Sequence, residues 1–201
     1  MADDLHLVDY GLFGVGALRF ARDRPNTEVL LGNHEVAMLW ALRDQTRIGW
    51  WISIGGQRHD LDELRKDEPL QQWVRERPAL VKLSDGTLVQ HCGNDAYLRI
   101  GSAVDSINQG VKELLQSGDE PLLWDLLSSA NIFETQPARL DRYLELMQGR
   151  RVVFGHKPHG GSKAMRYHGG KAINFDGGLS TSHRLYRRGA PPAASVGPLD
   201  P

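Results

Sequence analysis

The chain has 201 residues, of which 40% are hydrophobic and 24% are charged, as in an ordinary globular domain. Its 24 Lys and Arg residues balance 25 Asp and Glu residues, so a formal net charge of −1 gives no general attraction to nucleic acid or to an anionic membrane. The single cysteine, Cys92, excludes an internal disulfide and a zinc site built from cysteines.

No apolar run approaches the roughly 20 residues that cross a bilayer. The chain begins with the acidic letters MADD, the reverse of the basic start of a secretion signal. We therefore expect a cytoplasmic protein that binds neither nucleic acid nor a membrane.

Strand-like and helix-like stretches alternate along the first half of the chain. They are a strand at residues 5–8, a helix at 12–24, a strand at 27–31, a helix that ends near residue 43, and a charged helical stretch at 60–77 that Pro69 interrupts. Residues 50–56 predict an irregular segment. Residues 79–83 and 87–90 flank the letters SDG, which predict a β-hairpin.

The second half continues the alternation. Helices are expected at residues 104–116, 121–128 and 137–148, and strands at 151–154, 171–175 and 185–187. From Gly189 onward Ala, Pro and Gly dominate, which predicts a disordered tail. The sequence thus indicates one α/β domain over residues 1–188 and a tail over 189–201.

Three predicted strands end in polar corners that carry histidine. The letters GNHE at 32–35 follow the strand at 27–31, His91 follows the strand at 87–90, and His156 follows the strand at 151–154. Strand ends are where α/β folds place ligands. Imidazole nitrogens and an amide oxygen are ligands for first-row metals, so the corners predict a metal site. Taken alone, GNHE could be a plain helix start with Asn33 as N-cap.

The order of these corners resembles the calcineurin-like metallophosphoesterases, and most of all the bacterial branch of the serine/threonine phosphoprotein phosphatases. The motifs are LVDYG at 7–11, LLGNHE at 30–35, VQHCG at 89–93 and VVFGHKP at 152–158. The likeness extends over roughly residues 5–187. It implies an α/β fold of two packed mixed β-sheets flanked by helices.

The resemblance also implies roles for individual residues. Asn33, His91 and His156 match metal ligands, His34 matches the general acid that protonates the leaving oxygen, and Asp9 matches the carboxylate that orients His34. One or two divalent ions, manganese first and iron or zinc next, would activate the attacking water. The substrate would be a phosphorylated protein or a small phosphoester.

Part of the family pattern is missing. An Asp-x-His motif should stand well upstream, but the letters DLH at 4–6 lie too close to the next motif. His6 stands where a bridging Asp is expected, Tyr10 where an Arg is expected, and Lys157 where a Thr is expected. His6 could join Asn33, His91 and His156 as a metal ligand.

We therefore expect an incomplete amino-terminal unit that lacks the first metal-binding motif, and a reduced hydrolytic activity. The alternative is a non-catalytic pseudo-phosphatase or binding module that retains the scaffold. A missing first strand would expose a sheet edge, which predicts a homodimer through that edge.

Overall fold

The alternation of strands and helices appears in the computed structural model, which describes residues 4–6, 14–159 and 163–176. Its strands are β1 (Asp4–His6), β2 (Thr27–Val29), β3 (Leu80–Lys82), β4 (Thr87–Gln90), β5 (Arg151–Phe154), β6 (Met165–Tyr167) and β7 (Ala172–Asn174). Its α-helices are α1 (Gly14–Asp23), α2 (Asn33–Arg43), α3 (Ile48–Ser53), α4 (Arg58–Leu64), α5 (Glu68–Arg75), α6 (Val104–Ser117), α7 (Glu120–Leu127) and α8 (Pro137–Leu146). Short 3-10 turns are η1 (Gln45–Arg47), η2 (Ala96–Arg99), η3 (Ile132–Glu134) and η4 (His168–Gly170).

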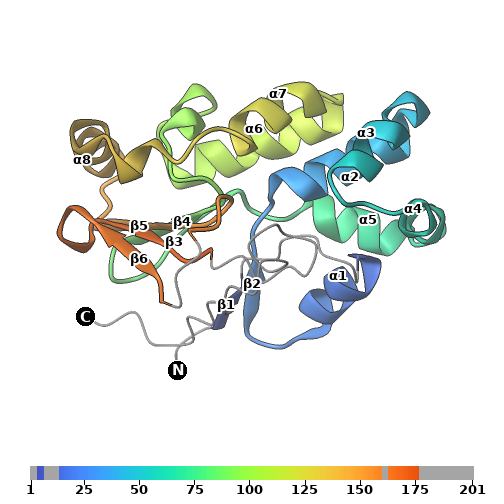
Figure 1. Cartoon of the computed structure of the whole chain (residues 1–201), viewed down its shortest axis with the longest axis horizontal. Coiled ribbons are helices and arrows are strands. Elements are labelled where there is room, and N and C mark those ends of the chain that lie inside the picture. The colour runs from blue at the N-terminus through green and yellow to red at the C-terminus, as the bar shows by residue number, and fades with distance from the viewer. Residues whose placement is uncertain (1–3, 7–13, 160–162, 177–201) are drawn as a thin grey trace.

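Five strands form one mixed sheet in the order β3-β4-β5-β7-β6 (Figure 1). The central strands β4, β5 and β7 run parallel, whereas β3 and β6 pair antiparallel at the two edges. A separate parallel pair joins β1 and β2. The α/β class is confirmed, but the two packed sheets are not seen in the described residues. With three residues in each strand, β1 and β2 form only a short two-stranded sheet.

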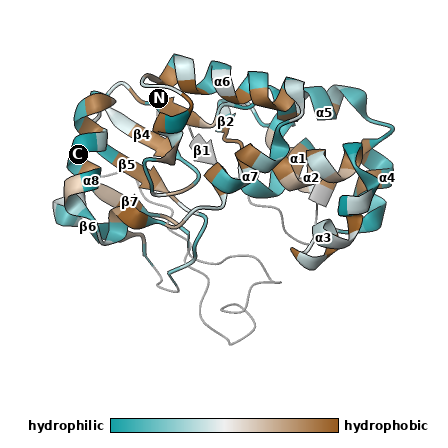
Figure 2. Cartoon of the chain, turned by 90° about the horizontal axis from the view of Figure 1, so that it is seen from above, coloured by the Kyte–Doolittle hydropathy of each residue, from teal (hydrophilic) through white to brown (hydrophobic). Residues whose placement is uncertain are grey.

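The central strands are buried on both faces, because their side chains alternate between two apolar clusters. Leu88 and Val152 belong to the large cluster, to which α2, α6, α7 and α8 also contribute. Val89 and Val153 point to the other face, where they pack with Ile173 and Leu30. In Figure 1 helices α6, α7 and α8 lie over one side of the sheet, and Figure 2 shows hydrophobic colour along its central strands.

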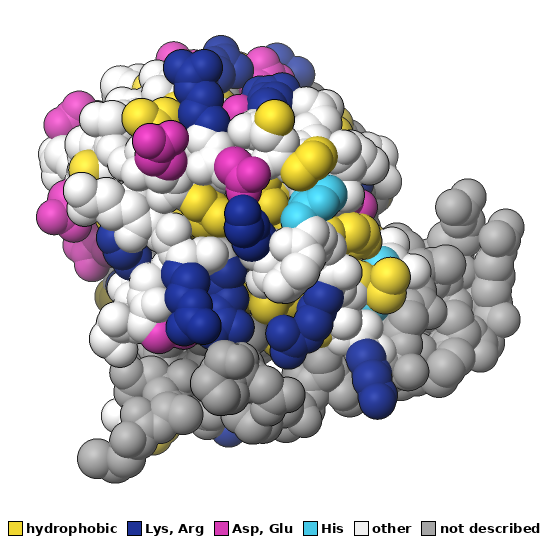
Figure 3. Space-filling model, turned by 90° about the vertical axis from the view of Figure 1, so that its left-hand side faces the viewer, with side chains coloured by type: hydrophobic (Ala, Val, Ile, Leu, Met, Phe, Trp, Pro, Cys, Tyr) yellow, Lys and Arg dark blue, Asp and Glu magenta, His cyan; other side chains and the backbone are white. Residues whose placement is uncertain are grey.

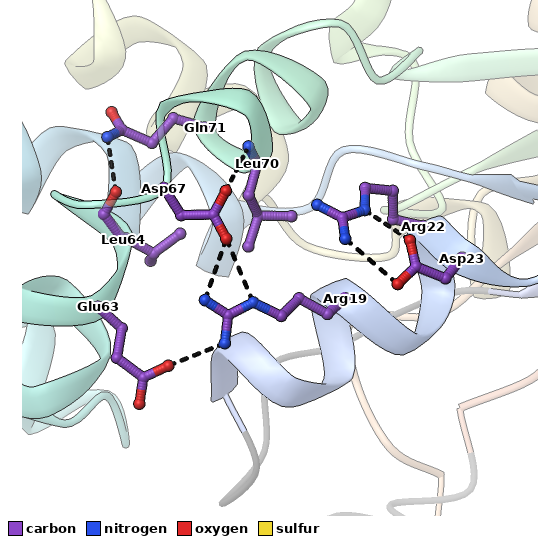
Figure 4. Close-up of polar contacts among 8 residues, drawn as sticks. All are labelled: Arg19, Arg22, Asp23, Glu63, Leu64, Asp67, Leu70 and Gln71. Atoms are coloured by element: carbon purple, nitrogen blue, oxygen red, sulfur yellow. Dashed lines mark hydrogen bonds and ion pairs between the residues drawn. The ribbon is translucent and has the colours of Figure 1, made fainter.

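Two helical segments depart from the sequence prediction. The segment expected to be irregular contains α3, which is held by fully buried Trp51, whose ring nitrogen donates to the Gln57 carbonyl at 3.2 Å. The long helix expected at 60–77 is two helices, because the Asp67 carboxylate caps α5 by accepting from the Leu70 N–H at 3.1 Å. Asp67 also accepts from Arg19, which joins α5 to α1 (Figure 4).

Several predictions concern residues outside the described part of the chain. These are Asp9, the strand at 185–187 and the tail at 189–201. Strand β6 is described but was not predicted from the sequence. Among the described residues, no helix is long and apolar enough to cross a membrane.

The formal net charge is near zero, but the charged side chains are not evenly distributed over the surface. On the face shown in Figure 3, Lys and Arg side chains lie at the top and again across the lower half of the described surface, where few Asp and Glu side chains accompany them. This face lies at the left of Figure 1, where the sheet ends at β6. Anionic molecules would therefore meet a locally cationic surface.

Candidate functional site

The three polar corners meet at the carboxyl ends of neighbouring strands. His91 directly follows β4, and the strand beside it, β5, leads through Gly155 to His156. Because β4 and β5 are parallel, their carboxyl ends lie at the same edge of the sheet. The Gly155 N–H donates to the His91 carbonyl at 2.9 Å, which joins the two corners through the backbone.

The side chains at these corners are within hydrogen-bond distance. His91 Nε2 lies 2.7 Å from Asn33 Oδ1 and 3.1 Å from His156 Nδ1. The two imidazole rings have centroids 4.9 Å apart and are inclined by 60°. Asn33 and His91 are buried, and His156 is half-buried. The structure therefore brings together Asn33, His91 and His156, which we call the histidine cluster.

Asn33 owes its position to the start of α2. Glu35 is buried, and its Oε2 accepts from the Gly32 N–H at 2.9 Å, which satisfies one of the free donors at the helix start. A Cβ on Gly32 would lie 2.7 Å from Glu35 Oε2 and 3.1 Å from the His91 ring. A larger residue at this position would therefore displace the carboxylate or the imidazole. The positive end of the α2 dipole is consequently placed beside the cluster.

Burial keeps His91 neutral at physiological pH. Burial is the main cause that lowers the pKa of its imidazole, and the charges of His156 and His34 lower this pKa further. A neutral ring with its proton on Nε2 can share that N–H between Asn33 Oδ1 and His156 Nδ1. The effect of His34 on the pKa also shows that this half-buried side chain lies within electrostatic range of His91.

The backbone of His156 is strained. Its φ angle is +71°, in the left-handed region that non-glycine residues rarely adopt. Such a conformation typically costs about 1–3 kcal/mol and persists only where the surrounding structure holds it. The placement of this imidazole beside His91 therefore lowers the stability of the fold by a cost of that size.

The structure does not describe the side chains of the two other predicted site residues. His6 ends β1, where it pairs with Val29 through the backbone. It therefore lies on the strand beside the one that leads to Asn33. Asp9 is outside the described residues.

The buried thiol of Cys92 is poorly suited to act as a nucleophile. Its Sγ donates to the Leu127 carbonyl at 2.7 Å, and burial raises the pKa of the thiol far above its usual range. A nucleophilic or metal-binding cysteine needs the thiolate. The ligand atoms of His91, Cys92 and His156 lie within 4.8 Å of one another, but the protonated thiol weakens this trio as a metal site.

A cavity of about 480 Å³ lies near the cluster without including it. It is lined by Asn94, Asp95, Ala96, Leu98, Arg99, Ser129, Ala130, Ile132 and Arg139. Asn94 and Asp95 belong to the same loop as His91, but none of the predicted site residues lines the cavity. The candidate site is therefore the histidine cluster, with the cavity beside it.

Sequence reasoning missed Asn131, which is buried beside both histidine corners. Its Oδ1 accepts from the Gly93 N–H at 2.8 Å, and its Nδ2 donates to the Gly155 carbonyl at 2.9 Å. The sequence around Asn131 carries no periodic or motif signal that would single it out. Only the three-dimensional arrangement reveals its contacts.

Comparison with known proteins identifies the fold. The solved structures similar to this chain include a cold-active protein tyrosine phosphatase from a psychrophilic Shewanella species, with 20% sequence identity and a TM-score of 0.53 over 76% of this chain and 50% of that one. A point mutant of a cold-active protein tyrosine phosphatase matches with 20% identity and a TM-score of 0.54 over 81% of this chain and 53% of that one.

The chain spans about half the length of the solved structures that it matches. No family model matches it, and no curated protein does. The comparisons therefore show the fold of this chain, and the similar structures are named phosphatases, the enzyme class expected from the sequence.

The comparisons correct two sequence predictions. The resemblance to calcineurin-like metallophosphoesterases is contradicted, because the similar structures are named protein tyrosine phosphatases and no family model supports the assignment. The divalent-metal cofactor, with manganese first, is corrected with it, because that family was its main support. Polar residues after strand ends are common to α/β folds. The short motifs were therefore not specific enough to assign the metallophosphoesterase family.

Proposed function

We propose that this chain is a phosphoester hydrolase, a phosphatase, whose site is the histidine cluster with His34. The observation that carries the proposal is that His91 Nε2 lies 2.7 Å from Asn33 Oδ1 and 3.1 Å from His156 Nδ1. Asn33 is the first residue of α2. Three separate segments of the chain supply these groups. The names of the structurally similar proteins agree with this reaction class.

The geometry suits a phosphoryl group. The N-terminus of α2 offers backbone N–H groups and the positive end of its dipole, which favour an anion. Imidazole N–H groups can donate to phosphoryl oxygens. Because His91 is neutral, the cluster binds chiefly through hydrogen bonds and the helix dipole.

In the proposed reaction a water attacks phosphorus and the bond from phosphorus to the leaving oxygen breaks. His34 gives its proton to that leaving oxygen. One proton of the water stays on the phosphate product, and the other replaces the proton that His34 gave up. General acid catalysis of this kind typically contributes about 10²–10⁴-fold. Asp9 is proposed as the group that orients His34, as the sequence suggested.

The substrate is proposed to be a phosphorylated protein or a small phosphomonoester. The similar structures are named protein tyrosine phosphatases, so phosphotyrosine is the first substrate to test. The homodimer expected from the sequence stays a prediction, which light scattering would test.

The test is hydrolysis by the natural chain and by a His34→Asn variant. We expect the variant to lose about 10²-fold or more with phenyl phosphate, and less with p-nitrophenyl phosphate, whose leaving group needs little protonation. A Cys92→Ser variant is the matched control and should retain activity, because serine can still donate to the Leu127 carbonyl.

Loss of activity in Cys92→Ser with retained folding would instead indicate a thiol nucleophile. Absence of turnover in the natural chain, with phosphate still bound, would favour the binding module that the sequence left open. Equal losses of His34→Asn on both substrates would contradict the role of His34 as general acid.

A further inference from the structure

Asn131 connects the two loops that carry the histidines. Its side chain accepts from the Gly93 N–H at 2.8 Å, two residues after His91, and donates to the Gly155 carbonyl at 2.9 Å, directly before His156. Only 7% of Asn131 is exposed, so these bonds are shielded from water. One buried amide therefore joins both histidine corners.

A second buried amide extends this connection. Asn174 is fully buried, and its Nδ2 donates to the Lys157 carbonyl at 3.0 Å, directly after His156. The same Nδ2 donates to Glu134 Oε1 at 2.9 Å, and Asn131 Nδ2 lies 3.3 Å from this oxygen. The backbone of His156 is thus held on both sides by amides that share one carboxylate.

The strained backbone of His156 needs such support. A left-handed φ of +71° reverts to a common conformation when its neighbours release it. Release would move the His156 ring away from His91 Nε2, to which it lies at 3.1 Å. The Asn131 contact to Gly155 acts on the peptide group next to the strained residue.

We propose that Asn131 is a positioning residue for the histidine cluster, which sets the separation of His91 and His156. The proposal rests on the proposed function, since it assigns Asn131 to the phosphatase reaction through these two histidines. A purely structural Asn131 would affect only the stability of the fold. The two roles can be separated, because the chain offers a comparable, half-buried amide elsewhere.

Asn108 in α6 is that matched control. Its Oδ1 accepts from the Ala79 and Leu80 N–H groups at 2.9 and 3.1 Å, and its Nδ2 donates to the Leu80 carbonyl at 2.8 Å. Like Asn131, it accepts from a backbone N–H and donates to a backbone carbonyl, but at the start of β3 and not at a histidine corner. Asn131→Ala and Asn108→Ala should lower the urea midpoint by similar amounts.

The deciding readout is the imidazole spectrum. Long-range ¹H–¹⁵N NMR of the natural chain, Asn131→Ala and Asn108→Ala reports the tautomer and shift of each histidine ring. We expect the His91 and His156 signals to move only in Asn131→Ala, and its kcat for p-nitrophenyl phosphate to fall at least 10-fold. Unmoved His91 and His156 signals in folded Asn131→Ala would overturn the proposal.

If Asn131→Ala does not fold, the exchange Asn131→Asp with Glu134→Gln tests the same point. It keeps the number of carboxylates and an acceptor for the Gly93 N–H, but removes the donor to Gly155. The His156 signals should then move more than those of His91, and unmoved His156 signals would overturn the proposal.

The proposed phosphatase function and the positioning role of Asn131 can fail separately. Moved signals in a chain that has no turnover would support the positioning role and overturn the proposed function. Turnover in the natural chain with unmoved signals in the variants would support the proposed function and overturn the positioning role of Asn131.

Discussion

At the residue scale, the neutral state of His91 links the site to pH. Burial, and then the charges of His156 and His34, lower the pKa of this imidazole below its usual value of 6.5. As the pH falls through 6.5, His91 therefore binds a proton in the unfolded chain but not yet in the folded chain. Where the unfolded state binds more protons, stability rises with pH. The stabilisation is complete above pH 6.5 and is lost as the pH falls toward the lowered pKa.

Chemical unfolding between pH 7.5 and 5 tests this linkage. The free energy of unfolding should fall by up to about 1.4 kcal/mol per pH unit below 6.5 through this one group. A His91→Asn variant should show a shallower slope than the natural chain. Identical slopes for the two chains would contradict a buried neutral His91.

At the element scale, the fold was more predictable than the site. The hairpin strand β4 and the strand β5 have the predicted bounds, because their apolar letters are bounded by clear turn signals. Helix α3 was missed, since it depends on burial of Trp51 and not on local periodicity. The histidine corners were found as strand ends, but Asn131 was not, because its bonds join segments 24 and 38 residues away.

The junction between α1 and α5 gives a prediction at this scale (Figure 4). Asp67→Ala removes the cap on the Leu70 N–H and the two contacts from Arg19 at 3.2 and 3.0 Å. We expect a loss of about 1–2 kcal/mol in unfolding free energy.

The matched control for this junction is Asp62→Ala. Its carboxylate is 67% exposed, and in the described part of the chain it pairs with Arg65 within one turn, so its loss should be below about 0.5 kcal/mol. Urea unfolding of both variants gives the comparison, and equal losses would refute a stabilising role for the Asp67 junction.

At the scale of the whole molecule, the site exists only when distant segments fold together. His91 lies 58 residues from Asn33 and 65 from His156 in the sequence, yet all three meet at one edge of the fold. The chain also spans about half the length of the phosphatase structures that share its fold. The central question is therefore whether the described site carries the chemistry.

Release of phosphate from phosphotyrosine, by the natural chain and by a His156→Asn variant, answers that question most directly. Asparagine tolerates the left-handed backbone of this position, so the variant removes the imidazole and leaves the loop in place. The account predicts measurable turnover by the natural chain and at least a 100-fold loss in the variant. Equal turnover by the two chains, or none by the natural chain above the buffer rate, would contradict it.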